Sequence, residues 1–107
     1  ILFEEKNIET YFIDQLETKT IKNIKKSIPK LDLIIDDGLH QPDANLNVIV
    51  DLLDHLNPNG ILVIEDIEPN FVHTFKIIEK IYNNSDSYKS SLIKMRNGYC
   101  LLIQNLR

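Results

Sequence analysis

Short apolar runs alternate with amphipathic stretches along most of this chain, and the alternation predicts an α/β fold. The predicted strands are apolar runs rich in β-branched and aromatic residues; they lie at residues 8–13, 31–35, 61–64, 92–95 and 99–104. The predicted helices repeat apolar residues at helical spacing; they lie at residues 18–28, 43–56 and 71–82. The last two strands flank Arg96-Asn97-Gly98, and an Asn-Gly pair between apolar runs is typical of a β-hairpin.

This order of elements predicts a mostly parallel sheet that ends in an antiparallel hairpin, because strands that alternate with helices form parallel crossovers. The runs at 31–35 and 61–64 are apolar without interruption, which is typical of strands that helices cover on both faces. The buried side of the second helix is predicted from its apolar positions. These are Leu46, Ile49, Val50, Leu53 and Leu56.

Composition narrows the class of protein. The chain has 107 residues, of which 43% are hydrophobic and 26% charged, as expected for one small globular domain. Its formal charge of −4 argues against nucleic acid as the main partner. No apolar stretch approaches the roughly 20 residues that cross a bilayer, so no membrane partner is expected. Cys100 is the single cysteine, which favours a cytoplasmic location, and we expect it to be an unreactive strand residue.

Two strand ends carry most of the chemistry. Residues 31–40 read LDLIIDDGLH, so Asp36 and Asp37 close one strand, and Glu65 and Asp66 close another. The carboxyl ends of neighbouring parallel strands meet at one crevice. Two carboxylates about 4 Å apart repel by roughly 4 kcal/mol at an effective dielectric of about 20, so the cluster needs a proton, a basic partner or a metal. Oxygen ligands suit Mg²⁺ or Ca²⁺. The alternative is that these acids are helix caps or solvated loop ends.

Two further side chains have more than one interpretation. His40 can act as a general base, since an unperturbed imidazole has a pKa of about 6.5, and this is the favoured interpretation; a metal ligand and a hydrogen-bonded loop residue are the alternatives. Asp14 follows the first predicted strand, where an acid can bind an adenine amino group or a ribose hydroxyl. A helix cap is an equally good interpretation of Asp14.

Three segments together resemble class I S-adenosylmethionine-dependent methyltransferases: LDLIIDDGLH, LNPNGILVIEDI and the IDQ after the first strand. They are most similar to the metal-dependent sugar O-methyltransferases of macrocin and mycinamicin type. The resemblance implies a Rossmann-like methyltransferase fold in which Asp37, Glu65 and Asp66 hold Mg²⁺. It also implies that His40 takes the proton from a small-molecule hydroxyl acceptor, a sugar or a sugar-bearing natural product. Asp14, Gln15 and Asp36 would contact S-adenosylmethionine.

The family's first two strands and its glycine-rich cofactor loop have no counterpart here, since the chain has only three glycines. The resemblance therefore implies that residues 1–107 are the C-terminal portion of a single methyltransferase domain, inactive without the rest. The strand at 8–13 would then lack its neighbour, and we expect residues 1–29 to be displaced or to pair with another copy in a homo-oligomer. Two other functions stay open: a metal-dependent phosphoester hydrolase and a non-catalytic association domain.

Overall fold

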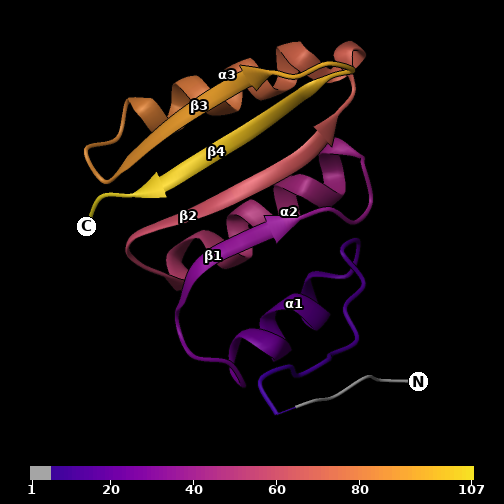
Figure 1. Cartoon of the computed structure of the whole chain (residues 1–107), viewed down its shortest axis with the longest axis vertical. Coiled ribbons are helices and arrows are strands. Elements are labelled where there is room, and N and C mark those ends of the chain that lie inside the picture. The colour runs from indigo at the N-terminus through magenta and orange to yellow at the C-terminus, as the bar shows by residue number, and fades with distance from the viewer. Residues whose placement is uncertain (1–5) are drawn as a thin grey trace.

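The computed structural model describes residues 6–107 and contains one four-stranded sheet with the strand order β1-β2-β4-β3 (Figure 1). The elements follow one another as α1 (Thr18–Lys25), β1 (Leu31–Asp36), α2 (Pro42–Leu52), η1 (Leu53–His55), β2 (Leu56–Ile67), η2 (Pro69–Phe71), α3 (Val72–Asn83), β3 (Tyr88–Lys94) and β4 (Tyr99–Asn105). The predicted α/β class is confirmed.

The strand directions also match the prediction. β1 and β2 are parallel and are joined through α2, as parallel neighbours require a crossover connection. β4 lies between β2 and β3 and is antiparallel to both. In Figure 1 the arrowheads of β1 and β2 and the β3–β4 turn lie at the same end of the sheet. The predicted C-terminal hairpin therefore reaches the strand ends that carry the acids.

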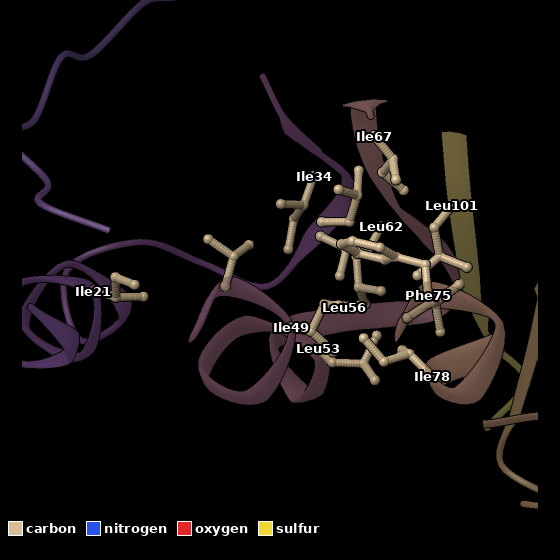
Figure 2. Close-up of a cluster of buried hydrophobic side chains, with 13 residues drawn as sticks. Ile21, Ile34, Ile49, Leu53, Leu56, Leu62, Ile67, Phe75, Ile78 and Leu101 are labelled. Atoms are coloured by element: carbon tan, nitrogen blue, oxygen red, sulfur yellow. The ribbon is translucent and has the colours of Figure 1, made fainter. Parts of the chain in front are cut away.

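The hydrophobic core lies between the sheet and the two helices α2 and α3, which cover one of its faces (Figure 1). Figure 2 shows Ile49 of α2 and Phe75 of α3 gathered against Leu62 and Leu101 of the sheet. All four side chains are 0–1% exposed. Burying a side chain of this size contributes about 1.5–3 kcal/mol, so this layer stabilises the end of the sheet that carries the site.

The other face of the sheet is open, and this corrects the prediction that helices cover both faces. Leu33 and Ile35 of β1 are each 54% exposed, and Ile61 and Val63 of β2 are half-buried. The reason is that α2 and α3 share one face, while α1 packs against α2 beyond β1 (Figure 1). Among the described residues nothing covers the opposite face.

The predicted strand at residues 8–13 is wrong. Only Ile8 forms an isolated bridge, and Phe12 is 76% exposed. The outer edge of β1 is free, but this segment forms no ladder with it, so its backbone stays outside the sheet. The expectation that the segment lies outside the sheet is confirmed for residues 6–29, and residues 1–5 lie outside the described part. Pairing with another copy stays a prediction.

The second helix begins where it was predicted to begin, but it ends earlier and packs differently. It runs over Pro42–Leu52, and a 3-10 turn follows it. Leu46 and Val50 are exposed, whereas Val48 and Ile49 are buried. The buried side also contains Asn45, which is 3% exposed. Ile49, Leu53 and Leu56 are buried as predicted, and only Leu46 and Val50 were assigned to the wrong side.

α1 ends at Lys25, before the predicted limit, while α3 and its buried Phe75 and Ile78 match the prediction. Within residues 6–107 no helix has the length and apolar character to cross a membrane.

Candidate metal centre

Asp36 organises the loop that follows β1. Its side chain is 5% exposed and points to the helix-covered side. Asp36 Oδ1 accepts hydrogen bonds from Gln15 Nε2 at 2.8 Å and from the Gly38 backbone N–H at 3.2 Å. Asp36 Oδ2 accepts one from Asn45 Nδ2 at 2.8 Å. A buried carboxylate with three donors is well satisfied, so it fixes the start of the loop at residues 37–40. Its predicted contact with a cofactor stays a prediction.

Gln15 ties the N-terminal segment to the same loop. Its Oε1 accepts a hydrogen bond from the Leu39 backbone N–H at 2.6 Å, and its backbone carbonyl accepts one from Asn47 Nδ2 at 2.8 Å. A Cβ at Gly38 would lie 2.2 Å from Gln15 Oε1. Gly38 does not have a positive φ, so the glycine is needed here for the space that it leaves to Gln15 and not for a left-handed backbone.

A β-bulge shapes the end of β2. Ile64 pairs with Leu101 and Ile67 pairs with Tyr99, so Glu65 and Asp66 together face the one residue Cys100. Regular alternation would turn Asp66 toward the helices. The extra residue instead leaves Asp66 exposed, with a φ of 54°, and returns Ile67 to the core. Aspartate tolerates this left-handed conformation better than most residues.

The two strand ends bring Asp37, His40 and Asp66 together. One ligand atom from each lies within 4.8 Å of the others, and within residues 6–107 they are the only such group of three. His40 Nε2 lies 4.0 Å from Asp37 Oδ1 and 3.9 Å from Asp66 Oδ2, too far for hydrogen bonds. In the described part of the chain no lysine or arginine forms an ion pair with these carboxylates. The group therefore fits a cation better than an internal ion pair.

A cleft of about 520 Å³ opens beside this group. His40, Glu65 and Asp66 line one side of it, and the β3–β4 hairpin residues Met95 to Cys100 line the other. Glu65 thus faces the same cleft but is not among the three converging residues. Clefts of 300–1,000 Å³ are the usual size for small-molecule sites.

A second cleft of about 490 Å³ lies on the other side of the loop, along the free edge of β1. Gln15, Asp36, Asp37 and Gly38 line its polar end, and apolar residues of α1, β1 and α2 line the rest. The loop at residues 37–40 therefore separates two clefts and contributes side chains to both.

Asp14 lies near this loop through its neighbour Gln15. Asp14 Oδ1 accepts a hydrogen bond from the Leu16 backbone N–H at 3.0 Å, and its backbone carbonyl accepts one from Thr20 Oγ1 at 2.9 Å. These bonds shape the turn before α1, but the helix-cap interpretation of Asp14 is wrong, because the N-cap of α1 is Glu17 and no side chain caps it. The predicted contact with an adenine group stays a prediction.

Sequence reasoning missed two contributors to this region. Asn45 donates a hydrogen bond to Asp36. The sequence sign of this role is that Asn45 lies three and four positions before the apolar Val48 and Ile49, on the same face of the helix. The hairpin tip forms a wall of the larger cleft, which only the sheet order reveals. His73 is exposed and does not line this cleft, whereas His55 Nε2 lies 2.9 Å from the Ile28 carbonyl oxygen, in a structural contact.

Cys100 provides a pH-dependent test of the acidic strand end. Burial, followed by the charges of Glu65 and Asp66, raises the pKa of the Cys100 thiol above its ordinary value. The thiol should therefore stay protonated near pH 8, and alkylation by iodoacetamide should accelerate only at higher pH. Glu65→Gln and Asp66→Asn each remove a negative charge, so each should shift the alkylation profile to lower pH. An unchanged profile in both variants would contradict the arrangement.

Comparisons with known proteins were made by family, by sequence and by structure. A scan of protein-family models gave no match. A curated relative from Streptomyces olivaceus, 8-demethyl-8-alpha-L-rhamnosyl tetracenomycin-C 2'-O-methyltransferase, is 28% identical over 72 residues, which cover 67% of this chain and 19% of the relative. The chain thus spans about a fifth of that protein's length.

Solved structures of the MycE methyltransferase from the mycinamycin biosynthetic pathway share the fold. The complex with Mg and SAH matches with a TM-score of 0.77 and 20% identity, covering 97% of this chain and 34% of MycE. The complex that also contains mycinamycin VI matches with a TM-score of 0.73 and 21% identity, covering 97% and 33%. The resemblance to methyltransferases is therefore confirmed: this chain is similar in sequence to a sugar O-methyltransferase, and it has the fold of about one third of another methyltransferase.

Proposed function

We propose that this chain is the C-terminal portion of an S-adenosylmethionine-dependent, Mg²⁺-assisted O-methyltransferase that acts on a sugar hydroxyl. The observation that carries the proposal is the convergence of Asp37, His40 and Asp66 between two clefts. A methyl transfer needs a donor and an acceptor on opposite sides of one reacting centre. The two clefts supply two such sides, and the methyltransferase relatives supply the reaction class.

The residues present fit a hard divalent cation. Mg²⁺ binds oxygen at about 2.0–2.1 Å, so opposite ligand atoms lie about 4.2 Å apart, and Ca²⁺ allows about 5 Å. The 4.8 Å limit on the converging atoms is compatible with one ion after small side-chain rotations. Asp37 and Asp66 would hold the ion, with Glu65 as the third carboxylate. Asp37 and Asp66 are exposed, which leaves positions for water and for the acceptor hydroxyl.

The chemistry divides between the ion and this chain's own residues. When bound, the ion supplies Lewis-acid polarisation of the acceptor hydroxyl. His40 accepts the proton of that hydroxyl as its oxygen bonds to the methyl carbon, and the sulfonium sulfur keeps the electron pair of the broken carbon–sulfur bond. The loop at residues 37–40, fixed through Asp36, holds the base between donor and acceptor, and such positioning supplies much of the acceleration.

The cleft along β1 would take part of the cofactor, with Gln15 and Asp36 on its polar side and Asp14 next to Gln15 in the chain. The open edge of β1 and the uncovered apolar face support the proposal that further parts of the domain lie there in the complete protein. Half a cofactor pocket binds weakly, so residues 1–107 alone should not catalyse transfer. The phosphoester-hydrolase alternative is less well supported, because the described residues contain a single group of converging ligands rather than two.

The test is methyl transfer from S-adenosylmethionine to a rhamnosyl acceptor by the protein extended toward its N-terminus. We expect transfer with Mg²⁺ and none in excess EDTA, because the acceptor hydroxyl then loses its Lewis acid. Calorimetry should detect S-adenosylmethionine binding by the extended protein and little or none by residues 1–107. Activity that persists in EDTA would end the metal assignment, and equal cofactor binding by both forms would contradict the proposed partial domain.

A further inference from the structure

The tip of the β3–β4 hairpin packs directly against the strand end that carries Asp66. Gly98 is buried, and a Cβ built on it would lie 2.4 Å from the Ile67 carbonyl oxygen. Ordinary contacts of this kind are 3.4 Å or longer, so any side chain at Gly98 would push the two backbones about 1 Å apart. Because the clash is with backbone, no rotamer change relieves it.

The same contact lies at the end of the β-bulge. Ladder pairing resumes between Ile67 and Tyr99 immediately after Asp66. If the bulge were lost and Asp66 paired with Tyr99, alternation would turn the Asp66 carboxylate toward the helices and away from His40. The direction of this carboxylate therefore depends on the register that the hairpin imposes on Ile67.

Lys94 fixes the shape of the tip. Its Nζ donates to the Met95 carbonyl oxygen at 2.8 Å and lies 5.1 Å from the centre of the Tyr99 ring. The Met95 backbone N–H donates to the Gly98 carbonyl oxygen at 2.8 Å. These contacts close the turn around Gly98 and hold it against Ile67.

We propose that Gly98 is a positioning residue for the cation site: the hairpin tip sets the bulge in β2 and so holds the Asp66 carboxylate toward Asp37 and His40. This inference rests on the proposed metal site and adds to it a determinant on the other side of the cleft. Ligand groups in such sites must be held to within about 0.5 Å, and the displacement that a Cβ would cause is larger.

The test measures Mn²⁺ binding by the 107-residue chain, using the electron paramagnetic resonance signal of free Mn²⁺. Gly98→Ala should weaken Mn²⁺ binding at least about tenfold, comparable to losing a group that orients a metal ligand. Gly60→Ala is the matched control, since a Cβ there would also meet backbone, at 2.9 Å from the Asn57 carbonyl oxygen, but at the other end of β2. Gly60→Ala should change Mn²⁺ affinity less than about twofold when both variants are compared at equal folded fraction by circular dichroism.

Lys94→Met decides the question if Gly98→Ala does not fold. Removing a positive charge near the site would by itself strengthen cation binding, so weaker binding in Lys94→Met would report lost geometry. Lys89→Met, an exposed lysine on the same strand, is its control. Two results would overturn this inference and leave the proposed metal site standing. One is a Gly98→Ala variant that folds and binds Mn²⁺ like wild type; the other is a Lys94→Met variant that binds Mn²⁺ no more weakly than Lys89→Met. A wild-type chain that binds no Mn²⁺ overturns the proposed metal site and this inference with it.

Discussion

Asp66→Asn should weaken Mn²⁺ binding by the chain at least about 100-fold, and Asp37→Asn should do the same. Even groups that only support a metal ligand cost about 10–100-fold in affinity when removed, and these two carboxylates would be ligands themselves. Asparagine keeps the size of the side chain and one oxygen but removes the negative charge, so the change isolates the electrostatic contribution. In the complete protein both variants should lose methyl transfer together with Mg²⁺ dependence.

Glu68→Gln is the control for this experiment, because Glu68 lines the same cleft but does not belong to the converging group. Glu68 would act on the divalent ion only through water and screening salt, so Glu68→Gln should change the affinity no more than a few-fold. A similar loss in all three variants would mean that the cation responds to general negative charge at this sheet end. Unchanged affinity in Asp66→Asn would contradict the proposed site.

The closeness of the two strand ends that carry Asp37 and Asp66 could be predicted from sequence, because it follows from topology alone. Two apolar runs that end in acids and are joined through a helix become parallel neighbours, and parallel neighbours share their carboxyl ends. The bulge at Glu65 could not be predicted. It depends on the register that β4 imposes on β2, and β4 lies more than 30 residues further along the chain.

The sequence errors have a common physical cause, since each concerns a contact that an element makes outside itself. Residues 8–13 have the composition of a strand, but they form no ladder with the free edge of β1. On α2, the apolar positions fit two neighbouring stripes, and the hydrogen bond from Asn45 to Asp36 selects the one that contains a polar residue. Neither the absence of a ladder partner for residues 8–13 nor the acceptor of the Asn45 hydrogen bond, Asp36, can be read from the segment concerned.

Gly98 illustrates the same limit. The Asn97-Gly98 pair located the hairpin correctly because such pairs favour turns with positive φ. Neither residue has a positive φ in the structure. The glycine is needed because Ile67 of another strand lies where a side chain would be. The Asn-Gly rule thus located the turn correctly, although the glycine is required by a tertiary contact and not by a positive φ.

His40→Ala should lower the rate of methyl transfer by the complete protein by about 10²–10⁴-fold, the usual contribution of a positioned general base. The variant separates two of the three interpretations that the sequence left open, the general base and the metal ligand. His40 Nε2 lies 3.9 Å from Asp66 Oδ2, close enough to take a proton from a hydroxyl held beside that carboxylate. If His40 is the base, Mn²⁺ affinity and S-adenosylmethionine binding should change less than about threefold while turnover is lost.

If His40 is instead a metal ligand, Mn²⁺ affinity should fall in parallel with turnover, as in Asp66→Asn. His73→Ala is the matched control, because His73 is an exposed histidine on α3 that does not line the cleft, and it should keep both turnover and Mn²⁺ binding. Loss of cofactor affinity in His40→Ala would contradict both roles, since the loop would then act on the cofactor cleft. Turnover, Mn²⁺ affinity and S-adenosylmethionine affinity of His40→Ala together distinguish the two roles. Losing a base affects only turnover, whereas losing a metal ligand also lowers Mn²⁺ affinity.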